Sequence, residues 1–250
     1  MGVSLVALRC RTADRFAGAP RGVEVLAPLV AGALGVEPRF IGTPGEIRET
    51  RYDEDLREAR GCLLEAGGQV DDALSGGNTP VLLAADCSVS ATTLPAALRH
   101  SPDARVLWLD AHGDYNTPDT SGSGYLGGMC LAAATGEWDA GLGDTVPPER
   151  VVLAGIRDLD PGEREEVATA GVGVGLPNEG MVYVHLDCDG LDPDVIPVQF
   201  PVLGGLTAAE VRDVLAALVA EGRLVGLEVT ALEYPEHVDV IAGILEPVTG

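Results

Sequence analysis

Residues 106–129 read VLWLDAHGDYNTPDTSGSGYLGGM, and this stretch decides how the chain folds and where its chemistry lies. It opens with the apolar residues 106–109, whose length and character are typical of a strand buried in a parallel sheet. Asp110, His112 and Asp114 follow at alternate positions, and alternate residues of an extended chain point to one side. Open α/β sheets bind ligands at the carboxyl ends of their strands. The stretch therefore predicts a site at a strand end.

A second stretch repeats this pattern. Residues 182–186 form another apolar run, and it leads into Asp187 and Asp189, again at alternate positions. Carboxylates gathered at two strand ends repel one another strongly unless a cation lies between them. Taken alone, the first cluster fits helix capping as well as it fits metal binding. The two clusters together favour a metal site.

Short apolar runs alternate with amphipathic segments along the whole chain. Strands are predicted at residues 3–8, 38–42, 81–84, 106–109, 151–154, 182–186 and 224–229. Helices are predicted at residues 22–35, 53–74, 88–100, 126–135, from 160 onward, 207–221 and 236–245. Such alternation indicates βαβ units with helices on both faces of a sheet. The sequence therefore predicts one α/β domain over residues 1–250, with three α/β/α layers and a mostly parallel central sheet.

Charge and hydropathy limit the partners. The formal net charge of -23 argues against nucleic acid and against an anionic membrane surface. No apolar run approaches the roughly 18 residues of a membrane-spanning helix, and residues 3–8 are too short for a signal peptide. We therefore expect a cytoplasmic protein that acts on a small molecule. A homo-oligomer is compatible with the sequence, which does not define the oligomeric state.

Cysteine usage predicts no disulfide framework. The chain has five cysteines, an odd number, and none of them are in a CxxC spacing. Four of them are interpreted as packing residues: Cys10, Cys62, Cys130 and Cys188. The remaining Cys87 follows an apolar run and is a candidate metal ligand.

The two Asp-rich stretches carry a family resemblance. DAHGDYNTPDTSGSG (110–124) and HLDCDGLDP (185–193) resemble the two signature segments of the ureohydrolases, the arginases and their relatives. AADCS (84–88) resembles a third segment, Gly-Gly-Asp-His-Ser. Weaker similarity is found in GIRDLDPGE (155–163), GGLT (204–207) and GLEVTALEYP (226–235). Because these segments occur in the family's order across nearly the whole chain, the resemblance implies an arginase-like fold.

The resemblance also implies a pair of Mn(II) ions. One ion would be bound by Cys87, Asp110, Asp114 and Asp187, and the other by Asp110, His112, Asp187 and Asp189. Carboxylate-rich coordination suits manganese. Asp114 would also accept a hydrogen bond or proton from the attacking water. The implied reaction is hydrolysis at an amidine-like carbon with loss of an amine.

Several positions depart from the family pattern at this site. Cys87 stands where a His ligand is expected, and sulfur is a poorer ligand than imidazole for manganese. An inert buried thiol is the alternative. Gly127 replaces the His that serves as proton shuttle, and Tyr125 replaces an Asn that helps to hold the substrate α-carboxylate. Asn116 and Ser123, which serve the same end of the substrate, are retained.

Three further positions bear on the chemistry at the guanidine end of the substrate. Ala231 stands where the family has a Glu that grips a guanidinium group. Glu233 either replaces that carboxylate or is a surface charge. His185 either supplies the missing proton donor or is a core histidine with satisfied hydrogen bonds.

These departures favour a guanidine that is neutral near pH 7. The expected reaction is hydrolysis of Nω-hydroxy-L-arginine to hydroxyurea and L-ornithine. The alternatives are an ordinary arginase, another ureohydrolase such as a guanidinobutyrase or formimidoylglutamase, and a non-catalytic metal-binding member of the family. The retained metal carboxylates and His112 argue against the non-catalytic alternative.

Overall fold

Eight strands form one parallel sheet in the computed structural model, which describes residues 2–250. The strands are β1 (Gly2–Leu8), β2 (Arg39–Ile41), β3 (Asn78–Leu83), β4 (Arg105–Leu109), β5 (Val151–Ala154), β6 (Gly173–Val174), β7 (Val182–Asp187) and β8 (Leu224–Thr230). Their spatial order is β2-β1-β3-β8-β7-β4-β5-β6, and every pairing is parallel. The predicted α/β fold is confirmed, and the sheet is wholly rather than mostly parallel.

The register of the central strands determines where Asp110 and Asp187 lie relative to each other. Every residue of β7 and β8 is buried, as expected for strands covered on both faces. Leu109 of β4 pairs with Leu186 of β7, which in turn pairs with Val229 of β8. The next residues, Asp110 and Asp187, therefore leave the sheet at the same level.

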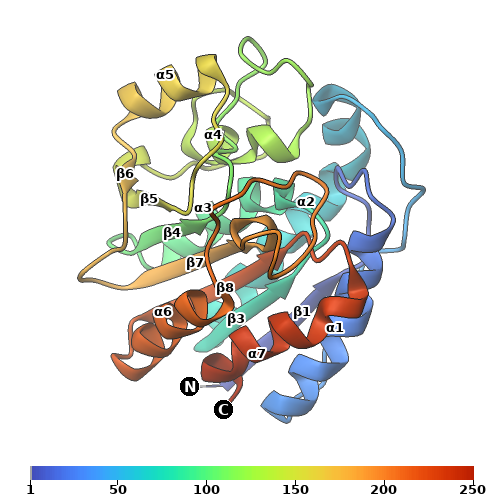
Figure 1. Cartoon of the computed structure of the whole chain (residues 1–250), viewed down its shortest axis with the longest axis vertical. Helices are drawn as coiled ribbons and strands as arrows, with labels where there is room; N and C mark the ends of the chain where they lie inside the picture. Colours follow the sequence, from blue (N-terminus) through green and yellow to red (C-terminus); the bar gives the residue numbers. More distant parts are fainter. Residues whose placement is uncertain (1) are drawn as a thin grey trace.

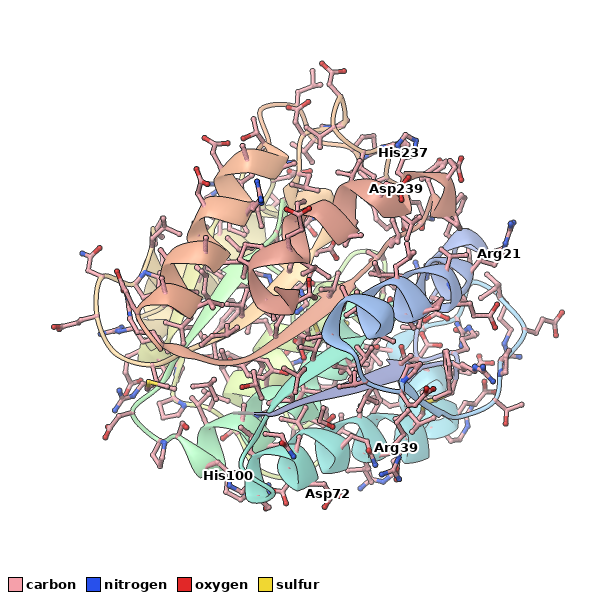
Figure 2. The ribbon with its side chains drawn as sticks, turned by 90° about the horizontal axis from the view of Figure 1, so that it is seen from below. Arg21, Arg39, Asp72, His100, His237 and Asp239 are labelled. Carbon is pink, nitrogen blue, oxygen red and sulfur yellow. A yellow bond between two sulfur atoms is a disulfide. The ribbon has the colours of Figure 1, made fainter. Side chains whose placement is uncertain are left out.

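Helices cover both faces of the sheet (Figure 1). One layer consists of α1 (Gly18–Leu34), α6 (Ala208–Ala220) and α7 (Val238–Thr249). The other contains α2 (Tyr52–Ser75), α3 (Ser90–His100), α4 (Cys130–Thr135) and, beside β5, α5 (Pro161–Ala170). Figure 2 shows the three layers edge-on, with His237 and Asp239 on one outer side and His100 and Asp72 on the other. No helix within residues 2–250 has the length and apolar character needed to cross a bilayer.

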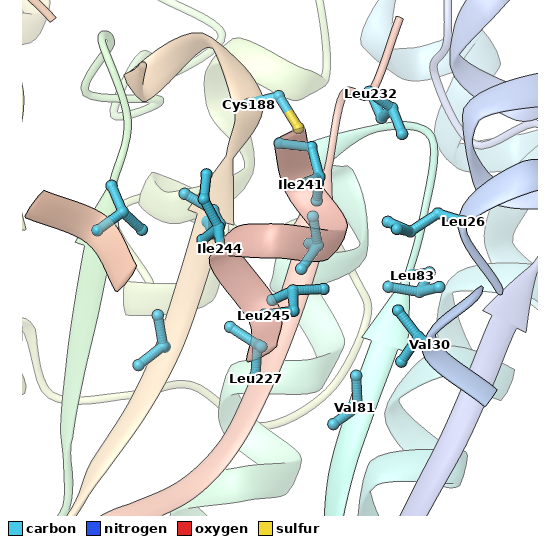
Figure 3. Close-up of a cluster of buried hydrophobic side chains, with 14 of the residues drawn as sticks. Leu26, Val30, Val81, Leu83, Cys188, Leu227, Leu232, Ile241, Ile244 and Leu245 are labelled. Atoms are coloured by element: carbon cyan, nitrogen blue, oxygen red, sulfur yellow. The ribbon is translucent and has the colours of Figure 1, made fainter. Parts of the chain in front are cut away.

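Alternate strand residues build a core on each side of the sheet. Leu82 and Trp108 pack toward the α2 and α3 layer. Their sequence neighbours pack toward α1 and α7, where the labelled side chains of Figure 3 interdigitate: Leu26, Val30, Val81, Leu83, Leu227, Ile241, Ile244 and Leu245. Because a parallel sheet needs apolar residues on both faces, the strands read as continuous apolar runs in the sequence.

Helix starts follow the sequence signals. Asp160 caps α5 in a capping box with Glu163, and Pro161 occupies the first helical position. Thr207 and Glu210 form the predicted capping box of α6. Where the sequence allowed either Asp158 or Asp160 as the cap of α5, the structure selects Asp160.

Two elements differ from the prediction in kind, and two helices differ in length: α1 begins at Gly18 rather than at residue 22, and α7 ends at Thr249 rather than at residue 245. The helix expected over residues 126–135 is divided into a 3₁₀ turn, Gly127–Met129, and the short helix α4. The edge strand β6 was not predicted, because its two residues, one of them Gly173, carry no apolar pattern.

The prediction of no disulfide is wrong for one pair of cysteines. Cys10, which follows β1, is bonded to Cys62 in α2, with Cα atoms 6.4 Å apart and a sequence separation of 52 residues. The two elements meet only through the fold, so the spacing of cysteines in the sequence does not reveal the pair. Cys87, Cys130 and Cys188 are free and buried. The cytoplasmic location stays a prediction.

Reduction of the Cys10–Cys62 bond should destabilise the protein by about 2–5 kcal/mol, because the bond restricts the unfolded chain. The measurement is chemical denaturation with and without a thiol reductant. The matched control is the double variant Cys10→Ser/Cys62→Ser, whose stability should not respond to the reductant. Unreduced, denatured wild-type protein should expose three reactive thiols. A count of five would contradict the bond.

Candidate metal centre and active site

Neighbouring strand ends bring the predicted metal ligands together. Asp110 directly follows β4, Asp187 ends β7, and Cys87 begins the 3₁₀ turn after β3. The Cys87 thiol lies 2.6 Å from Asp187 Oδ2 and 3.0 Å from the hydroxyl of Thr230, the last residue of β8. Residues that lie far apart in the sequence thus meet at one edge of the sheet.

One buried group of side chains could hold a cation. Ligand atoms of Cys87, Asp110, His185 and Asp187 all lie within 4.8 Å of one another. The sequence predicted Cys87, Asp110 and Asp187 for the first ion. Asp114, also predicted there, lies outside this group, and His185 lies within it.

A second group has its ligand atoms within the same limit of 4.8 Å and consists of Asp110, His112 and Asp189. His112 Nδ1 lies 3.0 Å from Asp189 Oδ2 and 3.5 Å from Asp110 Oδ1. The predicted fourth ligand, Asp187, accepts the backbone N–H of Asp189 at 2.7 Å instead of joining this group directly. Asp110 belongs to both groups, as a ligand shared by two ions would.

Asp114 connects the end of β4 to the start of α4 through its backbone. It has a φ of 48°, in the left-handed region that few non-glycine residues adopt. Its carbonyl oxygen accepts the N–H groups of Leu131 and Ala132 in α4, at 3.0 and 3.3 Å. Its carboxylate faces the cavity described below and lies 3.7 Å from the thiol of Cys130. Local backbone strain at such a position is typical of functional sites.

The buried carboxylates of the two groups repel one another, and a bound cation would relieve this repulsion. Burial, followed by repulsion from Asp189 and Asp110, raises the pKa of Asp187 well above its ordinary value. Burial and the charge of Asp189 likewise raise the pKa of Asp110 to about 6. Asp110 Oδ2 is buried and has no hydrogen-bond partner. A buried oxygen without a partner, close to other carboxylates, is what a metal ligand would be in the absence of its ion.

His112 responds to the same carboxylates. Burial alone would lower its pKa, but hydrogen bonds to Asp110 and Asp189 outweigh that effect and raise the pKa to about 12. A ring that binds a metal must give up its proton at the coordinating nitrogen. Metal binding at this group therefore displaces a proton from His112.

A cavity of about 250 Å³ opens above the two groups. Asn116, Ser123 and Tyr125, the predicted substrate residues, all line it. Asn116 Nδ2 donates to Asp160 at 3.1 Å, whereas its buried Oδ1 has no partner. Ser123 Oγ accepts the N–H of Tyr125 at 3.2 Å. The loop that follows β4 thus lines one side of the cavity with polar groups.

Tyr125 fills the room that Gly127 leaves. A Cβ added at Gly127 would lie 2.6 Å from the Tyr125 ring, so only glycine fits beneath it. The Tyr125 hydroxyl donates to Asp86, and the guanidinium of Arg15 lies 4.4 Å above the ring. The space beside Gly127 is therefore occupied by the Tyr125 ring.

The loop after β8 lines the opposite part of the cavity with Ala231 and Glu233. Glu233 is 8% exposed, which excludes the interpretation as a surface charge. One of its oxygens accepts the N–H of Gln199. Burial raises its pKa to about 7. Helix α1 locks this loop: a Cβ at Gly18 or Gly22 would overlap the carbonyl oxygens of Glu233 or Leu232.

The sequence did not indicate every residue of the cavity. Asp14, Arg15 and Phe200 also line the cavity. Burial, with the charge of Asp86 nearby, raises the pKa of Asp14 to about 7. Asp14 and Arg15 belong to the segment between β1 and α1, which has no periodic pattern to mark it. A polar stretch directly after a buried strand was the one available signal.

Comparison with known proteins identifies the family. A model of the arginase family matches residues 51–238. The chain belongs to the arginase family. It is therefore a ureohydrolase of the metal-dependent kind, with a buried metal-binding group at the end of its sheet.

Individual relatives of this arginase-family chain differ in their named activity. The Nω-hydroxy-L-arginine amidinohydrolase of Streptomyces lavendulae is 38% identical over 245 residues, covering 93% of this chain and 89% of that protein. An arginase of Brevibacillus brevis is 34% identical, covering 80% and 78%. The crystal structure of the Bacillus cereus arginase superimposes with a TM-score of 0.87 at 24% identity, covering 100% and 99%. The structural likeness shows the shared fold.

Manganese binding to the metal-free protein should release protons. His112, with its pKa of about 12, holds a proton at neutral pH, Asp110, with a pKa of about 6, takes one up as the pH falls toward 6, and a bound cation displaces both. The raised pKa of Asp187 acts in the same direction. Manganese affinity should therefore fall as the pH is lowered from 8 to 6. Calorimetric titration in buffers of different ionisation enthalpy measures the release. Asp187→Asn should abolish tight binding, and the exposed control Asp194→Asn should bind as wild type does. Affinity independent of pH would contradict the expectation.

Glu233→Gln should change how the stability of the metal-free protein depends on pH. The folded protein keeps the Glu233 proton up to about pH 7, whereas the unfolded chain loses it near 4.5, so this group's contribution to stability falls as the pH rises between those values. The variant lacks that loss. As the pH rises through this range, the free energy of unfolding of the variant should therefore increase relative to that of wild type, by up to roughly 3 kcal/mol.

Urea denaturation at several pH values measures the effect, and glutamine can still accept the Gln199 N–H. Glu236→Gln, an exposed position on the same segment, is the matched control and should follow wild type. Parallel pH profiles for Glu233→Gln and wild type would show that the carboxyl is ionised throughout.

Proposed function

We propose that this chain hydrolyses Nω-hydroxy-L-arginine to hydroxyurea and L-ornithine with two manganese ions. The observation that carries the proposal is the lack of a strong carboxylate at the guanidine end of the cavity. Ala231 lines the cavity where the family resemblance places a glutamate, and the nearby Glu233 has a pKa of about 7. The Streptomyces lavendulae relative, which covers nearly the whole chain, bears the name of this activity.

The residues that would hold the ions are Cys87, Asp110, His112, Asp114, Asp187 and Asp189. Their carboxylates suit manganese, and the shared Asp110 and the unpartnered Asp110 Oδ2 fit a paired site. Paired ions, when bound, lower the pKa of water and polarise an electrophile.

The other end of the cavity suits an amino acid. Asn116 and Ser123 offer polar groups to an α-carboxylate and an α-amino group. Arg15 is the one guanidinium among the cavity-lining residues and supplies positive charge for the carboxylate. Tyr125, whose hydroxyl is committed to Asp86, contributes the face of its ring.

The chain's own groups then assist the reaction. Asp114 accepts a proton from the attacking water as the new C–O bond forms at the guanidine carbon. The bond from that carbon to the side-chain nitrogen breaks, and this nitrogen takes the proton from Asp114 and leaves as the side-chain amine of L-ornithine. The remaining fragment is hydroxyurea. Glu233 hydrogen-bonds the guanidine and, with its pKa of about 7, suits a neutral group.

Arginase activity is the second candidate, because several relatives carry that name. Arginine has a guanidinium that stays charged at all physiological pH values. Without a carboxylate at position 231 it loses a charge-assisted hydrogen bond worth roughly 1.5–3 kcal/mol. The electronegative oxygen of a hydroxyguanidine lowers its basicity, so a larger fraction of it is neutral and it depends less on that contact.

Wild-type protein with manganese should therefore have a kcat/KM for Nω-hydroxy-L-arginine at least about tenfold that for L-arginine, the factor that corresponds to 1.4 kcal/mol. Ala231→Glu should shift the ratio toward arginine. Ala231→Gln, which adds the same bulk without charge, is the matched control and should not. A ratio of one or less in wild type would assign the protein to the ordinary arginases.

A further inference from the structure

His185 lies one layer below the metal carboxylates. It is two residues before Asp187 and on the same face of β7. In the sheet it pairs with Trp108 of β4 and with Glu228 of β8. Its ring stacks on that of Trp108, with centroids 3.5 Å apart and planes 7° from parallel. The side chain is fully buried and does not line the cavity. It therefore cannot meet the substrate as the predicted proton donor.

The lower edge of the ring is held by a carboxylate. His185 Nδ1 lies 2.8 Å from Glu228 Oε1 and 3.1 Å from Ser90 Oγ. Glu228 also accepts the hydroxyl groups of Ser90, Thr93 and Tyr183. When Nδ1 donates its proton to Glu228, the lone pair of Nε2 is left free.

The upper edge of the ring has no partner. His185 Nε2 is buried without a hydrogen bond, and so is Asp110 Oδ2, 4.0 Å away. That separation is too long for a hydrogen bond, yet it is short enough for both atoms to bind one ion. Cys87 and Asp187 offer atoms within 4.8 Å of these two. Two unpartnered buried atoms thus face the same small space.

We propose that His185 Nε2 is a ligand of the first metal ion and supplies the imidazole that is lost at Cys87. The proposal rests on the manganese-dependent function above. The carboxylate–histidine–metal arrangement is common in metal sites, where the carboxylate fixes the ring and its tautomer. Glu228 is then a positioning residue. Asp114 lies outside this group of ligand atoms.

The direct test is pulsed electron paramagnetic resonance of Mn(II) bound to protein labelled with ¹⁵N-histidine. Because His112 would also contribute a nitrogen, the measurement uses the His112→Asn protein. Its bound Mn(II) should show a coupling to one imidazole, and that coupling should vanish in His112→Asn/His185→Asn. Asparagine at position 185 keeps a donor for Glu228 and removes the atom equivalent to Nε2. Bound Mn(II) without any imidazole coupling in the His112→Asn protein would overturn the proposal.

Metal content provides an independent measurement. His185→Asn should lose one of two manganese ions per chain, and Glu228→Gln should bind the first ion about 10–100-fold more weakly. Cys188→Ser, a core substitution on the other face, is the matched control and should keep both ions. Two ions with wild-type affinity in a folded His185→Asn protein would also overturn the proposal.

The outcomes separate the two proposals. If wild-type protein binds no manganese, the proposed function fails. If it binds two ions and turns over substrate but His185 shows no coupling, only the assignment of His185 fails. Should His185→Asn not fold, as judged by circular dichroism of the metal-free protein, the His112→Asn spectrum still decides, because His185 is intact there.

Discussion

Repulsion between buried carboxylates at one edge of the sheet is the constraint on which the rest of the structure depends. The pairing of β4, β7 and β8 is fixed by apolar residues on both faces, and it brings Asp110 and Asp187 out at one height. Core packing therefore forces together groups that, without a cation, resist ionisation. This repulsion favours metal binding, since a bound cation removes the free-energy cost of bringing the carboxylates together.

The sequence predicts the parts of this arrangement that repeat locally. Apolar runs that end in alternating carboxylates place Asp110 and Asp187 at strand ends, and capping residues place the starts of α5 and α6. It does not predict contacts between distant segments. The burial of Glu233 depends on α1, and the bond between Cys10 and Cys62 depends on how β1 meets α2. No local pattern encodes such contacts.

Departures from the family pattern come in compensating pairs rather than as single losses. Glycine at 127 makes sense only with Tyr125, whose ring occupies the space a side chain would need. The histidine missing at position 87 has a counterpart in His185, held from below by Glu228 and its hydroxyl donors. A site that had merely decayed would not keep Glu228 with every donor in place, because a buried carboxylate is tolerated only when it is fully hydrogen-bonded.

The close approach of α1 to the loop after β8 limits how this protein can change. The glycines of α1 leave no room for the Leu232 and Glu233 carbonyls to move outward, and Ala231 has a φ of 57°. Grafting a loop from a relative, or lengthening this one, would collide with the first helix. Any change in this loop is thus tied to a helix near the other end of the chain. Evolution, or an engineer, has to exchange both segments at once.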